Sequence, residues 1–246
     1  GEGNWYVYPL TAFLTRDKTL FYQHNLAPET FTFDLATLRW NLATGYMLSY
    51  DTYASEYGGG LDSPWLDLVA IVQSEVLSQY ADELAVDFSF VAPEVSLTAF
   101  ETFSVTANWS NTVPYTMGMH AISPGGVYVS NNRDIAAGMF TAYNGDPLLG
   151  AEHFIVERRT PDAVMVWKPL GSQTPLKVLP LSGWADGDRV LVSACGRDAH
   201  CVHSETVIIA NNVIQFTYNP VTESQDVWHY RLVKVTVWLY LPIVLK

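Results

Sequence analysis

Polar side chains follow two predicted strands at the point where each strand ends. Residues 19–22 form a short apolar and aromatic run, and His24 follows it closely. A second run, residues 46–50, ends at Asp51. Ligand sites of parallel α/β folds lie in the loops that follow the carboxyl ends of the strands. We therefore expect a site near His24 and Asp51, in which the imidazole binds a ligand or positions an acid; a structural histidine is the alternative.

Two predicted helices would hold these strand ends in place. The first runs from candidate N-caps among residues 30–34 to Gly45, a typical helix stop. The second begins at Ser63 with Pro64 in its first position and ends near residues 82–84. Its predicted buried face has apolar residues at helical spacing: Leu68, Val69, Val72, Val76, Leu77 and Tyr80.

The hydrophobic period changes near residue 85, and short alternating strands follow to the end of the chain. Turn sequences such as SPGG, YNGD and WADGD separate them at the spacing of a β-sandwich. The sequence thus predicts an α/β part, residues 1–85, and an all-β part, residues 86–246. The predicted strands are 86–91, 103–109, 126–130, 136–143, 153–157, 163–168, 189–194, 205–210, 213–218 and 230–241.

Several stretches together resemble a known enzyme family. The order YQHNLAPET, RWNLATGY and MLSYD resembles the last strands of a (β/α)8-barrel glycoside hydrolase of the α-galactosidase-like kind. AGMFTAYNGDPL and WKPLGSQTPL resemble the β-sandwich that trails such barrels. The resemblance implies an α+β multidomain fold, with a partial (β/α) barrel followed by an antiparallel β-sandwich. It also implies carbohydrate as the partner and no cofactor.

The predicted α/β part is incomplete, because a barrel needs eight βα units and a small parallel sheet leaves its faces bare. We expect the chain to be the C-terminal piece of a longer precursor, whose remaining barrel comes from a second chain or from a homo-oligomer.

Glycoside hydrolysis requires two carboxyl groups that face each other across the sugar. The resemblance places the paired acids on earlier strands than those found here, with Glu2 the one exception. The catalytic candidates are Glu2 and Asp51, although a surface or capping role is an alternative for each carboxylate. Four residues are candidates for binding sugar hydroxyls and sugar faces: Trp5, Tyr22, His24 and Tyr50.

Charge and composition exclude some other functions. The formal net charge is -12, and no basic cluster is present, so a nucleic-acid partner is excluded. No apolar run is long enough for a membrane span. Phosphate-binding, serine-hydrolase and HExxH motifs are absent from the sequence. Asp186 and Asp188 favour a solvated turn over a calcium loop, and Asn108-Trp109-Ser110 is a glycosylation pattern.

The two cysteines, Cys195 and Cys201, are six residues apart in ACGRDAHC. A disulfide is the preferred interpretation, and it indicates a secreted, extracellular or cell-surface protein. A metal site with His200 and His203 is an alternative, but the spacing of a structural zinc site is missing. No metal is therefore predicted, and free thiols are the third possibility.

The apolar C-terminal stretch, TVWLYLPIVLK, resembles a short tail of some secreted bacterial surface proteins, and the last strand of the sandwich is the alternative. The sequence as a whole therefore predicts that the chain is the C-terminal portion of a secreted glycoside hydrolase-like protein that acts on or binds carbohydrate. The alternative is a non-catalytic extracellular protein, either carbohydrate-binding or a subunit of a surface layer or filament, which completes itself against neighbouring copies.

Overall fold

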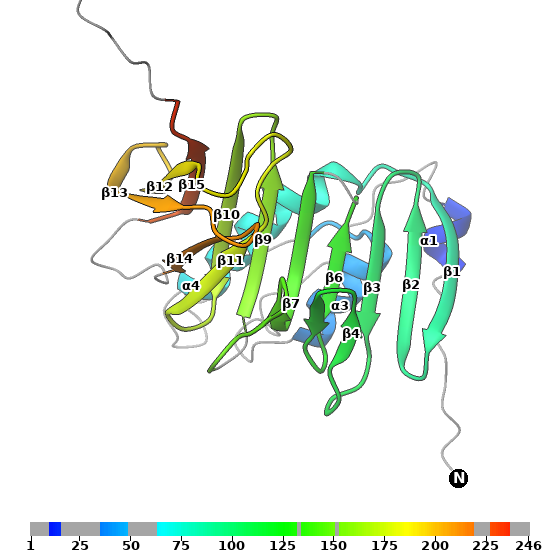
Figure 1. The fold of residues 1–246 in the computed structure, drawn as a ribbon. Coiled ribbons are helices and arrows are strands. Elements are labelled where there is room, and N and C mark those ends of the chain that lie inside the picture. Colours follow the sequence, from blue (N-terminus) through cyan, green and yellow to red (C-terminus); the bar gives the residue numbers. More distant parts are fainter. Residues whose placement is uncertain are drawn as a thin grey trace, which may run out of the picture.

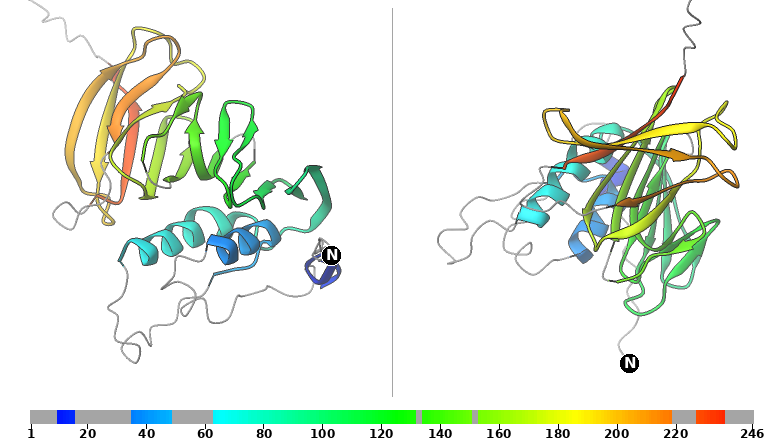
Figure 2. Two further views of the ribbon diagram at one scale, coloured as in Figure 1. Left: turned by 90° about the horizontal axis from the view of Figure 1, so that it is seen from below. Right: turned by 60° about the vertical axis from the view of Figure 1, so that its left-hand side comes forward.

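The computed structural model describes residues 10–15, 35–48, 63–131, 134–150, 153–218 and 227–236. Within these residues the protein is mostly antiparallel β-sheet (Figure 1). Its large sheet has 13 strands, and a separate pair, β11 (Thr174–Val178) and β14 (Ile214–Tyr218), forms a second small sheet. Helices lie on one face of the large sheet (Figure 2).

The large sheet has a main path of ten neighbouring strands in the order β1-β2-β3-β6-β7-β9-β10-β15-β12-β13. Its strands are β1 (Ala85–Ala92), β2 (Val95–Phe100), β3 (Ser104–Asn108), β6 (Val127–Ser130), β7 (Ile135–Tyr143), β9 (His153–Arg159), β10 (Ala163–Leu170), β12 (Arg189–Cys195), β13 (Cys201–Ile208) and β15 (His229–Lys234). Two further strands, β5 (His120–Ile122) and β8 (Asp146–Pro147), pair with β7, and β4 (Tyr115–Met117) pairs with β5.

The helices are α1 (Leu10–Thr15), α3 (Leu35–Thr44) and α4 (Ser63–Ile71). A π-helix, η2 (Val72–Val76), and a 3-10 turn, η3 (Leu77–Gln79), continue α4. The predicted buried face of this second helix is confirmed, because all six of its predicted residues are buried. Gly45, with φ of 68°, ends α3 in the left-handed conformation that glycine adopts without strain, as predicted.

Alternation along the strands gives the sheet two apolar faces. Val127 and Val129 of β6 point into a core that they share with α3 and α4, and Tyr128 points to the opposite face. The core on that opposite face includes Leu176 of β11 and Phe216 of β14. The sheet is therefore packed on both sides, which fits the predicted β-sandwich in its coarse form.

The helices before residue 85 and the strands after it bury their side chains in one cluster, in which Leu38 and Leu68 lie with Val105. The Tyr80 hydroxyl also donates a hydrogen bond of 2.7 Å to the Leu42 carbonyl. Among the described residues, helices precede residue 85 and strands follow from it, as the change of hydrophobic period predicts. The helices pack on antiparallel strands. All strand pairs among the described residues are antiparallel, so a partial barrel stays a prediction.

Most predicted strands are present, with some differences in position and number. The strand predicted at 205–210 is present over residues 205–208, but β13 begins earlier, at Cys201, and ends at Ile208. Five strands were not predicted from the sequence: β2, β4, β5, β8 and β11. Of the strand predicted at 46–50, the described residues 46–48 contain one bridge residue, Met47.

Candidate functional site

The six residues predicted for catalysis and sugar binding lie outside the described residues: Glu2, Trp5, Tyr22, His24, Tyr50 and Asp51. Their roles stay predictions. The predicted disulfide between Cys195 and Cys201 is confirmed. It joins the facing ends of β12 and β13, so these cysteines are not metal ligands.

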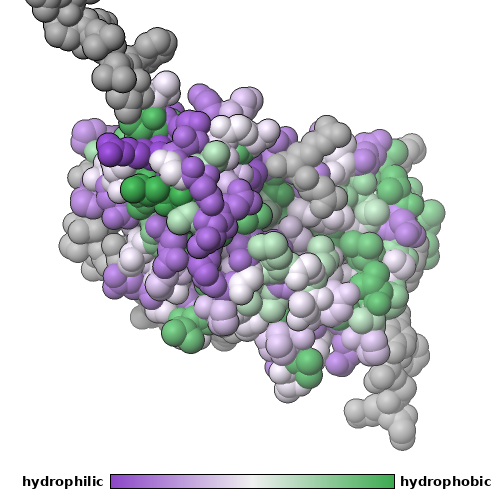
Figure 3. Space-filling model, viewed as in Figure 1, coloured by the Kyte–Doolittle hydropathy of each residue, from purple (hydrophilic) through white to green (hydrophobic). Residues whose placement is uncertain are grey.

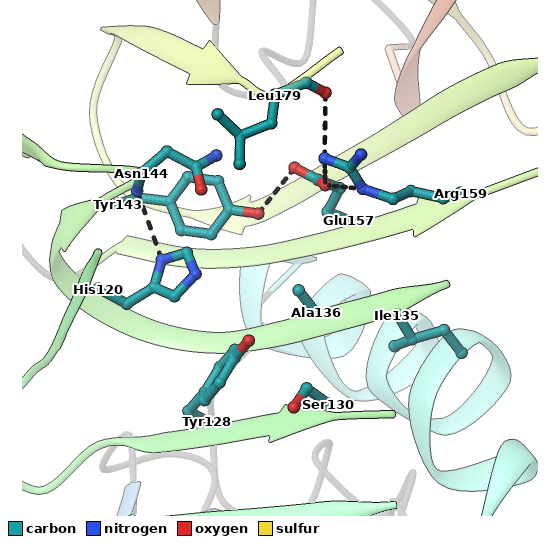
Figure 4. A pocket seen from close by; sticks show the side chains of 10 residues that line it. All are labelled: His120, Tyr128, Ser130, Ile135, Ala136, Tyr143, Asn144, Glu157, Arg159 and Leu179. Atoms are coloured by element: carbon teal, nitrogen blue, oxygen red, sulfur yellow. Dashed lines mark hydrogen bonds and ion pairs between the residues drawn. The ribbon is translucent and has the colours of Figure 1, made fainter. Parts of the chain in front are cut away.

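The described residues contain a polar pocket on the sheet face opposite α3 and α4. Its volume is about 330 Å³. The side chains come from β5, β6, β7, the turn after β7, β9 and the segment after β11 (Figure 4). The lining residues are His120, Tyr128, Ser130, Ile135, Ala136, Tyr143, Asn144, Glu157, Arg159 and Leu179.

Small residues in neighbouring strands make the floor of this pocket. Ser130 of β6 faces Ala136 of β7, and Ala136 faces Glu157 of β9 in the register of the sheet. Gly138, two residues along β7, lies between Tyr128 and Ile155. Facing side chains in a sheet are close neighbours, so the small side chain of Ala136 leaves space above β7.

A carboxylate, a guanidinium and a phenol form a hydrogen-bonded group at one side of the pocket. Glu157 is buried, with only 3% of its surface exposed. Its Oε2 accepts a hydrogen bond of 2.8 Å from the Tyr143 hydroxyl, and its Oε1 accepts one of 2.7 Å from Arg159 Nε. A buried carboxylate is stable when it is paired and hydrogen-bonded in this way.

Arg159 also fixes the segment that covers this group. Its Nη2 donates to the Leu179 carbonyl at 3.1 Å, and its Nη1 donates to the Pro180 carbonyl at 3.5 Å. The guanidinium therefore cross-links β9 to the residues after β11. Its donors are directed to Glu157 and to backbone oxygens, as Figure 4 shows for Glu157 and Leu179.

Aromatic rings form the other wall. The His120 ring lies 4.8 Å from the Tyr143 ring and 5.2 Å from the Tyr128 ring, measured between centroids. His120 Nδ1 accepts a hydrogen bond of 3.4 Å from the Asn144 backbone N–H, which assigns the proton of the neutral ring to Nε2. The Asn144 side chain donates to the Lys177 carbonyl at 2.8 Å, and its oxygen remains an acceptor.

Burial shifts the pKa values of three side chains in the pocket in the direction that favours their neutral forms. Burial, followed by the negative charge of Glu157, raises the pKa of Tyr143 well above its usual value. Burial also raises the pKa of Tyr128, against an opposing hydrogen bond from Ser130. Burial lowers the pKa of His120. At neutral pH the pocket thus holds two phenols, a neutral imidazole and the compensated Glu157–Arg159 pair.

The pocket combines hydrogen-bonding side chains with aromatic rings. Glu157 is the single carboxylate among the residues that line the pocket, whereas glycoside hydrolysis uses two. No group of three or more His, Cys, Asp or Glu side chains in the described parts of the chain could hold a metal ion.

Two sequence signals for this pocket were not used in the prediction. Glu157 follows the buried Ile155 at a spacing of two residues in HFIVERR, so the alternation of the strand places a carboxylate on an inward-facing position. The predicted Asn144-Gly145 turn is confirmed, with φ of 49° and 84°, but its asparagine also lines the pocket. No local sequence pattern indicates that both residues belong to one site.

The glycosylation pattern at Asn108 lies in an inaccessible place. Asn108 has 1% of its surface exposed, and its amide donates hydrogen bonds to the Val113 and Ser123 carbonyls. Glycan attachment would break both bonds, so this asparagine is structural in the folded protein. At the predicted turn, Asp188 accepts from the Ala185 N–H and pairs with Lys234 at 2.6 Å, which explains its position without a calcium ion.

None of the helices in the described ranges has the length and apolar character needed to cross a membrane. No protein-family model matches the sequence, and a search of curated proteins finds no match.

Proposed function

We propose that the protein is a non-catalytic extracellular carbohydrate-binding protein whose pocket holds one neutral sugar unit. The observation that carries this proposal is the combination of aromatic rings and hydrogen-bond acceptors around a floor of small residues. Sugar rings present both C–H faces and hydroxyl groups, so a site that binds them combines apolar faces with directed polar groups.

The hydrogen-bonding groups favour a neutral ligand that is rich in hydroxyls. The charge of Glu157 is compensated by Arg159, whose guanidinium is directed to protein oxygens. The side-chain oxygens of Ser130, Asn144 and Glu157 can accept hydrogen bonds from a ligand. The carboxylate of an acidic sugar would lie near the Glu157 carboxylate, and the pocket offers no further cation to compensate its charge. The binding of acidic sugars is therefore disfavoured.

Extracellular localisation is part of the proposal and is supported by the disulfide. The hydrolase prediction depends on Glu2 and Asp51, which the pocket does not contain. It stays a separate prediction for residues 1–85.

Calorimetric titration of the full chain with neutral monosaccharides and their uronic acids tests the proposal. Ala136→Val adds methyl groups to the pocket floor and should weaken sugar binding roughly tenfold or more, a loss of about 1.4 kcal/mol. Tyr128→Phe removes a hydroxyl from the wall and should weaken it to a smaller extent. Ala121→Val is the matched control, because Ala121 lies in β5 but does not line the pocket.

Two results would contradict the proposal. One is the absence of binding to every neutral sugar by a chain with the folded circular-dichroism spectrum. The other is binding that Ala136→Val and Ala121→Val change equally. Uronic acids that bind more tightly than their neutral counterparts would show that the charge argument is wrong.

A further inference from the structure

Exposed apolar side chains gather at the edge of the sheet where β1 lies. Of the twelve large hydrophobic residues that are exposed among those described, six belong to α1, to β1 or to the residue before β1. Helix α1 contacts β1, and Figure 3 shows hydrophobic residues along this side of the molecule. We call this set the β1 patch: Leu10, Leu14, Leu84, Val86, Phe90 and Val91.

The β1 patch has an apolar groove and an acidic border. The β1–β2 turn, residues 90–94, lines a groove of about 500 Å³. Val86 and Val91 expose 60% and 46% of their surfaces. Asp82, Asp87 and Glu94 are exposed nearby. Apolar patches of this kind on a protein surface mark interaction sites.

The most apolar stretch of the chain could cover this patch. Residues 237–245, VWLYLPIVL, contain no charged side chain, and Lys246 follows them. The stretch is rich in β-branched and aromatic residues, which have a high propensity for strands. Its chemistry complements the β1 patch, since apolar side chains would meet the groove and a lysine would meet the acidic border.

Geometry places the two partners in different copies. Strand β15, which ends at Lys234, lies seven strand positions from β1 in the sheet order, roughly 34 Å at 4.8 Å per strand. Figure 1 shows β1 and β15 at opposite sides of the sheet. Leu241, in the middle of the stretch, is seven residues beyond Lys234 and reaches at most about 25 Å from the end of β15, so the stretch cannot lie along β1 of the same copy.

We infer that residues 237–245 of one copy cover the β1 patch of a second copy. The contact is head-to-tail, so repeated copies form a ring or an open filament. A contact through one short segment is small, and self-association should therefore depend on protein concentration.

Cross-linking between two single-cysteine variants tests the inference directly. Val91→Cys and Leu241→Cys are mixed as full chains and oxidised mildly, and a disulfide-linked species of twice the chain mass is expected. Ile208→Cys replaces Val91→Cys in the control, because Ile208 is at least as accessible as Val91, with 60% of its surface exposed, but lies on β13. Equal linkage in the control would overturn the inference.

Light scattering at several protein concentrations gives the second test. The unmodified chain should associate, and Val86→Glu/Val91→Glu should reduce its association constant roughly tenfold or more, since two charges would enter an apolar contact. Leu241→Lys in the partner should restore part of the loss, and Ile208→Glu should have no effect. A chain that stays monomeric at all concentrations, or an intramolecular link in a chain with both cysteines, would overturn the inference.

Discussion

Gly138 shows how one residue can decide the spacing of two central strands. A Cβ atom at this position would meet the Val127 carbonyl oxygen and the Tyr128 backbone in β6. The backbone has no flexible end that could move aside, so the strands must separate. Gly138 thus lets β6 and β7 approach closely, and Ser130 and Ala136 of the same two strands line the polar pocket.

Gly138→Ala should therefore destabilise the protein by about 3 kcal/mol, at the upper end of the cost of overpacking. Gly183→Ala is the control, because open space surrounds Gly183 and its φ of 85° adds only the strain of a left-handed residue, about 1 kcal/mol. Urea unfolding of both variants measures the difference. Equal losses would show that β6 and β7 can separate without cost.

Arg197 connects the disulfide turn to a helix on the sheet face. Its guanidinium pairs with Asp67 of α4 and lies over the Trp228 ring, 4.2 Å from the centroid. Trp228 is itself held by a hydrogen bond of 2.7 Å from its backbone N–H to the Cys195 carbonyl. At the scale of elements, the turn between β12 and β13 thus helps to fix α4 on the sheet.

Replacing both cysteines by serine should lower the free energy of unfolding by about 2 kcal/mol, the value expected for closing a loop of this length.

Arg197→Ala should speed hydrogen exchange in α4, and Arg197→Lys should do so less because it keeps the charge. Exchange measured by mass spectrometry checks both, with α3 as an internal reference. If hydrogen exchange in α4 is unchanged in Arg197→Ala and in Arg197→Lys, the turn between β12 and β13 does not help to fix α4 on the sheet.

At the scale of the whole molecule, the side chains whose pKa values are shifted by burial define a pH range of maximal stability. Burial raises the pKa of Tyr143 and Tyr128, so the folded state keeps protons that the unfolded chain loses. Stability is therefore complete below the unfolded tyrosine pKa of about 10 and falls as pH rises above it. Burial lowers the pKa of His120 and His229, so stability falls as pH drops below about 6.5.

Urea unfolding between pH 5 and 11 should consequently give a plateau between about pH 6.5 and 10. Tyr143→Phe should reduce the alkaline slope, because it removes the most strongly shifted phenol, and His120→Gln should reduce the acidic slope. Tyr115→Phe is the control, since Tyr115 is partly exposed in β4. An alkaline slope that Tyr143→Phe leaves unchanged would contradict the assignment.

The sequence by itself determined the local features of this protein. Gly45 ended α3, Asn144-Gly145 formed a turn, and six apolar residues at helical spacing formed the buried face of the second helix. The cysteine spacing predicted the disulfide. Each of these signals depends on neighbours within a few residues, where backbone preference and side-chain period dominate.

Only the tertiary structure decided what those elements pack against and where the pocket lies. The helices cover an antiparallel sheet because apolar faces far apart in the sequence meet in one core. Ser130, Ala136 and Glu157 become neighbours through the register of β6, β7 and β9, and Arg159 reaches the residues after β11 through its side chain. Such contacts depend on long-range strand pairing, which the residue pattern of any one strand does not specify.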